Sequence, residues 1–160
     1  MKAAAMDNID AVMKLAKLTE FGSPYVKINR AAAKSFYAQA VRLQNIDADF
    51  QMTEDMMKTA SSALVDLIVN TRLLAMADKG HTGSQILLAE RMVSGTQFYA
   101  PNNELANIWF LRAALEGSPK GLLMASEILY PGETNIPKSI KILEYSAKKE
   151  MHLPTIRRLG

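Results

Sequence analysis

The chain has 160 residues, long enough to bury a hydrophobic core, and its 49% hydrophobic and 22% charged residues are typical of a globular domain. The sequence has no cysteine, which excludes disulfides, thiolate metal sites and a cysteine nucleophile. A formal net charge of only +3 disfavours a dedicated nucleic-acid-binding protein. Asp7 and Asp10 interrupt the N-terminal apolar residues, and no apolar run approaches the roughly 20 residues that span a bilayer. We therefore expect a cytoplasmic protein without a signal peptide or a membrane span.

Residues 1–52 are predicted to form an N-terminal helical segment, either a helical cap or a divergent repeat. Apolar residues at helical spacing predict a first helix over residues 8–20. The pair Ser23–Pro24 is typical of a helix start and predicts a second helix that ends at about Gln44. Residues 45–52 are interpreted as a loop.

Residues 53–160 are predicted to continue from this segment in one domain, beginning with a long helix from Thr53 to about Lys79. Six residues of this helix keep a heptad-like spacing and predict a buried seam: Met57, Ala60, Leu64, Leu67, Thr71 and Leu74. Four others predict a second apolar face, so that the helix lies between neighbours: Val65, Ile68, Val69 and Met76. Three methionines near its start are interpreted as core filling or as an adaptable binding surface: Met52, Met56 and Met57.

From Gly80 onward the chain repeats a unit of short helix, glycine, loop and helix. Gly80 and Gly117 differ by 37 residues, as do Gly95 and Gly132. Glycine and Ser-Pro punctuation predicts helices over residues 85–94, 103–116, 120–129 and 137–150. A period in the thirties predicts an all-α fold of antiparallel helix pairs, stacked as a short α-solenoid behind the N-terminal helical extension. Residues 151–160 begin a third copy, either as a terminal cap or as part of a longer array.

Two stretches of this repeat carry a family pattern. Five residues follow Trp-aromatic-x-x-Ala-Ala-x-x-Gly: Trp109, Phe110, Ala113, Ala114 and Gly117. Four follow the second pattern of the family with substitutions: Leu88, Ala89, Met92 and Gly95. On these residues the chain resembles the Sel1-like repeat, a relative of the tetratricopeptide repeat, over about residues 70–160. We expect six residues to be structural parts of the repeat: Gly80, Gly95, Trp109, Ala113, Ala114 and Gly117.

The resemblance implies a non-catalytic adaptor or scaffold that presents a helix-lined surface to a peptide or a partner protein. Such proteins often serve bacterial assemblies for secretion or signalling. The loop aromatics Phe98 and Tyr99 are the kind of side chain that anchors an interface. We predict that six residues contact the partner: Arg91, Phe98, Tyr99, Asn103, Asn107 and Arg112.

No motif predicts catalysis, a metal site or a cofactor. His81 and His152 hold the same place in successive repeats. They are therefore expected to lie about 10 Å or more apart, too far to share an ion. The expected protein is not an enzyme and needs no cofactor.

Two alternatives remain open besides the adaptor. A nucleic-acid-associated protein would use the basic residues near the C-terminus, Lys148, Lys149, Arg157 and Arg158, which salt-dependent binding would reveal. A self-assembling homo-oligomer would pair through the open end of the repeat array, since an uncapped solenoid exposes apolar surface.

Overall fold

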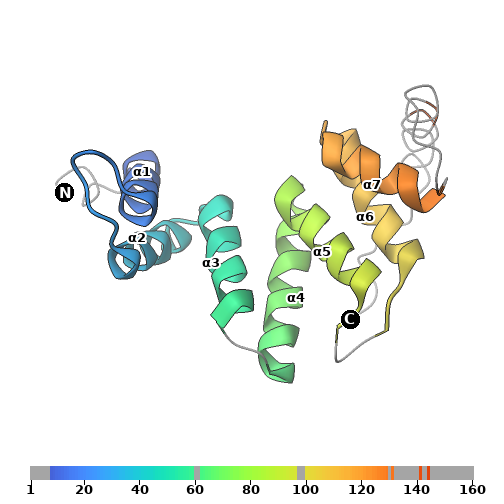
Figure 1. Cartoon of the computed structure of the whole chain (residues 1–160), viewed down its shortest axis with the longest axis horizontal. Coiled ribbons are helices and arrows are strands. Elements are labelled where there is room, and N and C mark those ends of the chain that lie inside the picture. The colour runs from blue at the N-terminus through green and yellow to red at the C-terminus, as the bar shows by residue number, and fades with distance from the viewer. Residues whose placement is uncertain are drawn as a thin grey trace. The chain divides into compact units, whose positions relative to one another are not determined.

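The computed structural model describes residues 8–59, 62–96, 100–129, 131, 141 and 144. These described residues form seven α-helices and one isolated bridge between Ser23 and Val26 (Figure 1). The helices are α1 (Ile9–Phe21), α2 (Arg30–Arg42), α3 (Ile46–Thr59), α4 (Ala63–Asp78), α5 (Thr82–Ser94), α6 (Asn103–Leu115) and α7 (Pro119–Leu129). The predicted all-α class is confirmed.

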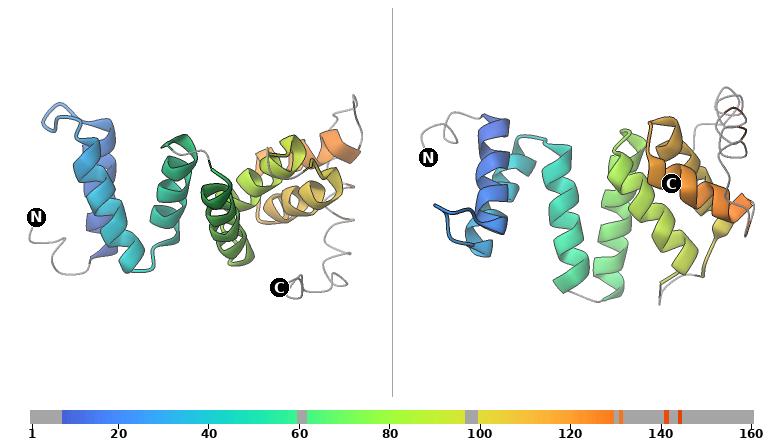
Figure 2. Two further views of the ribbon diagram at one scale, coloured as in Figure 1. Left: turned by 90° about the horizontal axis from the view of Figure 1, so that it is seen from below. Right: turned by 45° about the horizontal axis from the view of Figure 1, so that its top comes forward.

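The chain divides into two compact units, unit 1 (Met1–Arg72) and unit 2 (Leu73–Gly160), and the boundary falls inside α4. In unit 1, α1 packs on α2 and α2 packs on α3 (Figure 2). The buried core of these three helices is Val12, Ala16, Ala33, Tyr37, Ala40 and Ala48. Because four of these six side chains are alanines, the helix backbones can approach closely.

In unit 2, α5 packs on α6 and α6 packs on α7. The buried side chains of these helices include Leu88, Ala89, Ala106, Trp109, Phe110, Ala113, Ala114 and Ala125. Gly121 lies where α7 meets α6: a methyl group there would stand 2.8 Å from both Ala113 Cβ and the Phe110 carbonyl oxygen. Glycine at this position therefore permits the close contact between the two helices.

The N-terminal segment repeats the helix pair α5 and α6. Both bounds of α1 and of α2 precede the bounds of α5 and of α6 by 73 residues. The Asn29 N–H donates to the Thr19 carbonyl at 2.7 Å, and 73 residues later the Asn102 N–H donates to the Met92 carbonyl at 2.7 Å. The N-terminal helical extension is thus itself a repeat.

The second helices of successive repeats bury equivalent positions. Leu73 of α4 precedes Phe110 of α6 by 37 residues, and both are fully buried. Tyr37 of α2 holds the same place 36 residues before Leu73 and is also buried. The residues that follow these helices, Gly80 and Gly117, are both left-handed, with φ of 84° and 89°.

The predicted single helix from Thr53 to Lys79 is wrong, because this stretch holds two helices, α3 and α4. Asn45 Oδ1 accepts the Ala48 N–H at 2.8 Å and so caps α3, which begins inside the predicted loop. α4 begins directly after Ser62. No glycine or proline marks the break, so the usual sequence signal of a helix end is missing.

The predicted buried seam is also wrong. Leu64 and Leu67 are 66% and 63% exposed, and Leu74 is exposed as well. The buried side of α4 instead includes Val69 and Met76, two residues of the predicted second face. α4 therefore has a row of exposed leucines.

The second helix begins at Arg30 rather than at Pro24. Asn29 Oδ1 accepts the Ala32 N–H at 3.0 Å and caps the helix, whereas Ser23 and Pro24 lie in the turn closed by the bridge. The predicted helices over 85–94, 103–116 and 120–129 are confirmed as α5, α6 and α7. Apart from residues 141 and 144, the predicted helix over 137–150 and the third copy lie outside the described residues.

Exchanging the two left-handed turn residues tests their equivalence. Gln44 has φ of 61°, and Gly117 has φ of 89° with no atom within 4 Å of an added Cβ. Because only the backbone conformation is at stake, Gln44→Gly should raise the free energy of unfolding by about 0.5–1 kcal/mol. Gly117→Gln should lower it by a similar amount. Urea unfolding followed by circular dichroism measures both, and two changes of the same sign would contradict the equivalence.

Gly121→Ala should destabilise the protein by about 1–3 kcal/mol, because the new methyl group overlaps α6. Thermal and urea unfolding measure the loss. Glu127→Ala, at an exposed position of the same helix, is the control and should change stability little. Equal stability of the two variants would show that the contact between α6 and α7 relaxes freely.

Candidate functional site

Unit 1 contains an open groove of about 610 Å³ between α1, α2 and α3. Its apolar lining consists of Phe21, Ile28, Ala33, Tyr37, Met52 and Met56. Its polar lining consists of Glu20, Arg30, Lys34, Gln51, Asp55, Lys58 and Thr59. An apolar surface with a few charged groups is the usual composition of a binding site.

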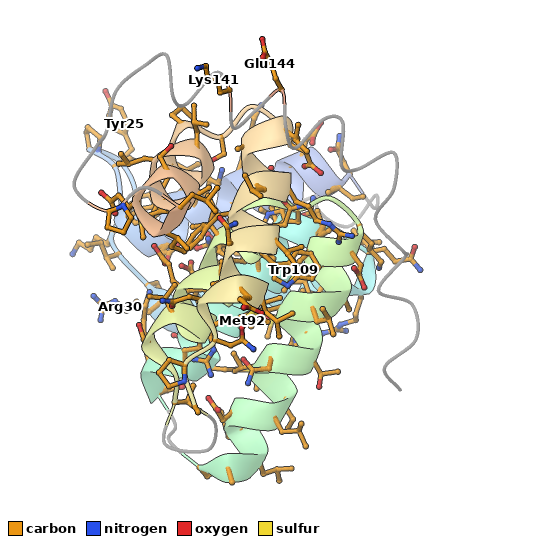
Figure 3. The ribbon with its side chains drawn as sticks, turned by 90° about the vertical axis from the view of Figure 1, so that its right-hand side faces the viewer. Tyr25, Arg30, Met92, Trp109, Lys141 and Glu144 are labelled. Atoms are coloured by element: carbon orange, nitrogen blue, oxygen red, sulfur yellow. The ribbon has the colours of Figure 1, made fainter. Side chains whose placement is uncertain are left out.

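The loop from Gly22 to Asn29 borders this groove through Ile28. Gly22 has φ of 75°, and a Cβ there would lie 3.0 Å from Ile28 Cγ1, so glycine lets the loop fold back on itself. Phe21, Tyr25 and Ile28 are 71%, 97% and 63% exposed. Figure 3 shows Tyr25 projecting outward from this loop. Phe21 and Ile28 thus face solvent where they line the groove, and Tyr25 faces solvent from the same loop as Ile28.

Both carboxylates of the groove are engaged. Tyr37 donates its hydroxyl to Glu20 Oε2 at 2.6 Å, joining α2 to α1. Burial, together with this hydrogen bond to the Glu20 carboxylate, raises the pKa of Tyr37 well above its ordinary value. Asp55 Oδ2 lies 2.8 Å from Lys34 Nζ, which joins α3 to α2.

Arg30 and Lys58 lie at the same end of the groove. The Lys34–Asp55 pair fixes the antiparallel register of α2 and α3, so Arg30, one turn before Lys34, comes level with Lys58, one turn after Asp55. Neither Arg30 nor Lys58 has an ion-pair or hydrogen-bond partner among the described residues. Arg30 is also the first residue of α2, whose first turn carries no acidic residue.

Two solved structures are similar to this one. A protective antigen of uropathogenic Escherichia coli that displays an SLR fold matches with a TM-score of 0.68 and 22% identity. The match covers 94% of this chain and 32% of the antigen, so the chain spans about a third of its length. A Sel1 repeat protein from Oxalobacter formigenes matches with a TM-score of 0.63 and 17% identity over 79% of this chain and 93% of that protein. The chain has the Sel1-like repeat fold. No protein-family model and no curated protein matches the sequence.

The predicted partner-contact residues of the Sel1-like repeat lie mainly on α5 and α6. Arg91 on α5 is half-buried, and on α6 Asn103 is exposed while Asn107 is half-buried. Asn107 Oδ1 is buried without a hydrogen-bond partner. Phe98 and Tyr99 lie outside the described residues.

The sixth predicted contact residue, Arg112, packs inside unit 2. Its guanidinium carbon lies 4.7 Å from the ring centre of Trp109, a cation–π distance. Its Nη1 also lies 3.6 Å from Asp78 Oδ1. Arg112 therefore contributes to the packing of α4 against α6 within unit 2. Its contact with a partner stays a prediction.

The residues predicted to be structural lie at turns or in the core. Gly80, Gly95 and Gly117 have positive φ, and they follow α4, α5 and α6. Trp109, Ala113 and Ala114 are buried. The four basic residues of the nucleic-acid alternative, Lys148, Lys149, Arg157 and Arg158, lie outside the described residues.

His81 caps α5: its Nδ1 accepts the Ser84 N–H at 3.1 Å. His152 lies outside the described residues. Among the described residues, no three His, Asp or Glu side chains form a group that could hold a metal ion. None of the described helices is long and apolar enough to cross a membrane.

Sequence reasoning missed the groove, because it left residues 1–52 open between a helical cap and a divergent repeat. The signal was present: "FYAQAVRLQ" from Phe36 precedes "WFLRAALEG" from Trp109 by 73 residues. By the same offset, Arg30 and Lys34 correspond to the predicted contact residues Asn103 and Asn107. The methionine cluster did give a partial signal: Met52 packs against the core of unit 1, and both Met52 and Met56 line the groove.

Tyr37→Phe tests the hydrogen bond inside the groove. The substitution should cost about 1–2 kcal/mol of stability at neutral pH, since it removes the donor to Glu20. Because the pKa of Tyr37 is raised in the folded state, the unfolded chain ionises first as the pH rises above about 10. This contribution to stability is present below pH 10 and is lost above it. The stability gap between the wild type and Tyr37→Phe should therefore shrink from pH 8 to pH 11 in urea unfolding, and a constant gap would contradict the assignment.

Proposed function

We propose that this Sel1-like repeat chain is a non-catalytic protein-interaction module that binds a peptide segment of a partner protein in the groove of unit 1. The observation that carries the proposal is the open groove itself, lined in part by the exposed side chains of Phe21 and Ile28. Exposed aromatic and apolar side chains gathered beside a concave surface are typical of interaction sites.

The size and composition of the groove suit a peptide. Its 610 Å³ falls in the range of about 300–1,000 Å³ that binding pockets occupy. Burying one large apolar side chain contributes about 1.5–3 kcal/mol, so two or three such anchors contribute about 3–9 kcal/mol and support a Kd in the millimolar to micromolar range. Met52 and Met56 can adjust their side chains to differently shaped anchors.

Unit 2 carries equivalent positions on its own helices. Asn103 and Asn107 of α6 occupy the positions that Arg30 and Lys34 occupy in α2. A second contact of the same partner, through Arg91, Asn103 and Asn107, is therefore part of the proposal. The proposal also includes a cytoplasmic location and membership of a bacterial multi-protein assembly. Nothing in the described residues favours the nucleic-acid alternative or self-assembly through the repeat end.

Truncating the exposed anchors tests the proposed function. Phe21→Ala/Ile28→Ala should weaken partner binding at least about tenfold, because two apolar side chains lose their burial in the complex. The measurement is affinity purification of the tagged chain from its native host, with the recovered partner quantified by mass spectrometry and its Kd measured by calorimetry.

Leu64→Ala/Leu67→Ala is the matched control, since these two leucines of α4 are as exposed as Phe21 and Ile28 but do not line the groove. Both variants should keep the helical circular dichroism of the wild type. A partner that binds the anchor variant as tightly as the wild type would refute the groove as its binding site.

A further inference from the structure

We infer that the groove of unit 1 selects an acidic peptide, one in which carboxylate side chains flank an apolar anchor residue. This inference rests on the proposed function and names the chemistry of the partner. Its basis is that the carboxylates of the groove have partners within the fold, whereas two of its cations have none in the described part of the chain. The carboxylates of Glu20 and Asp55 already have partners in Tyr37 and Lys34. The cations of Arg30 and Lys58 have none among the described residues.

The two unpaired cations act together because they lie at one end of the groove. Arg30 stands at the N-terminus of α2, where the backbone N–H groups carry partial positive charge. Asn29 accepts one of these N–H groups, and no side-chain carboxylate occupies the first turn. Lys58 lies level with Arg30 on the neighbouring α3. A carboxylate at this end would meet both cations and the N–H groups at the start of α2. The C-terminal ends of α1 and α3 lie at the same end and carry partial negative charge, so the two side-chain cations carry the selection.

The apolar lining supplies the second half of the selection. Phe21 and Ile28 line the groove and belong to the end of α1 and the loop that leads into α2. A bound apolar side chain between Phe21, Ile28 and Met56 would therefore lie within a few residues of the carboxylate that meets Arg30. An apolar lining favours a peptide over a nucleic acid, whose backbone needs a longer row of cations.

Exposure determines the kind of selectivity to expect. Arg30 and Lys58 are exposed, so their attraction for a carboxylate is screened by water and by salt. The two cations should therefore determine which peptides bind and raise their association rate, while the apolar contacts supply most of the affinity. Removing the carboxylates should weaken binding about fivefold to tenfold at low salt and less at high salt.

The experiment is selection of a random 12-residue peptide library, displayed on phage, against the full chain and against Arg30→Glu/Lys58→Glu. The wild type should enrich peptides that combine Asp or Glu with Leu, Ile, Phe or Met. The charge-reversed variant should enrich peptides with Lys or Arg beside the same apolar residues. Lys14→Glu/Lys17→Glu, two exposed lysines of α1 outside the groove, changes the net charge equally and should select the same peptides as the wild type.

The most enriched wild-type peptide is then synthesised together with a copy in which Asn and Gln replace Asp and Glu. Fluorescence anisotropy measures both against each variant at low and high salt. The acidic peptide should bind about fivefold to tenfold more tightly than its neutral copy, and this advantage should vanish on Arg30→Glu/Lys58→Glu. Circular dichroism confirms that all variants are folded.

The outcomes separate the inference from the proposed function. Selected peptides that need Phe21 and Ile28 but are neutral or basic, and that bind Arg30→Glu/Lys58→Glu equally well, would keep the groove and overturn the acidic class. A selection without any peptide that depends on Phe21 and Ile28 would overturn both. Binding of a labelled single-stranded 20-nucleotide DNA that is lost on Arg30→Glu/Lys58→Glu would assign the cations to a nucleic acid and overturn the peptide.

Discussion

Each of the three repeats that the structure describes in full closes on one residue in the left-handed region, and the packing of the helices depends on that residue. Gln44, Gly80 and Gly117 have φ of 61°, 84° and 89°. The next N–H then donates back into the preceding helix: Asn45 to Ala40 at 3.0 Å, and 73 residues later an equivalent bond of 2.9 Å. The reversed chain starts a new helix almost at once, and that helix must lie against the one just ended. Small side chains at the contact follow from this constraint.

The same scaffold carries different side chains at equivalent surface positions, and that difference makes the groove. In α2 the exposed positions before Tyr37 hold cations, Arg30 and Lys34, whereas the corresponding positions of α6 hold the amides Asn103 and Asn107. The backbone of the two helices is alike in its caps and its ends. Binding chemistry is thus set by side chains on a shared frame, and the frame alone does not define a partner.

The sequence predicted the helices of unit 2 well because glycine or Ser-Pro punctuates almost every end there. It failed at α3 and α4, since the residues between Thr59 and Ala63 include neither glycine nor proline. The first repeat remained one of two alternatives, beside a helical cap, because Phe36 and Gln44 stand where the family pattern has tryptophan and glycine. Gln44 shows why the pattern misleads: an exposed turn position can hold a non-glycine residue at positive φ. The groove could not be predicted, because its lining comes from three helices and a loop whose register only the folded chain fixes.

The cations of the two units differ in how far the fold itself uses them. In unit 2, Arg112 covers the ring of Trp109 and lies near Asp78, so its charge is balanced inside the repeat. At the position equivalent to Trp109, unit 1 has the smaller Phe36, and no cation–π contact is found there among the described residues. Arg30 and Lys58 contribute no ion pair to the stability of unit 1. A charged side chain that has no ion pair within the fold remains available to bind a partner. The unpaired charges of a repeat therefore indicate its ligand better than the paired charges do.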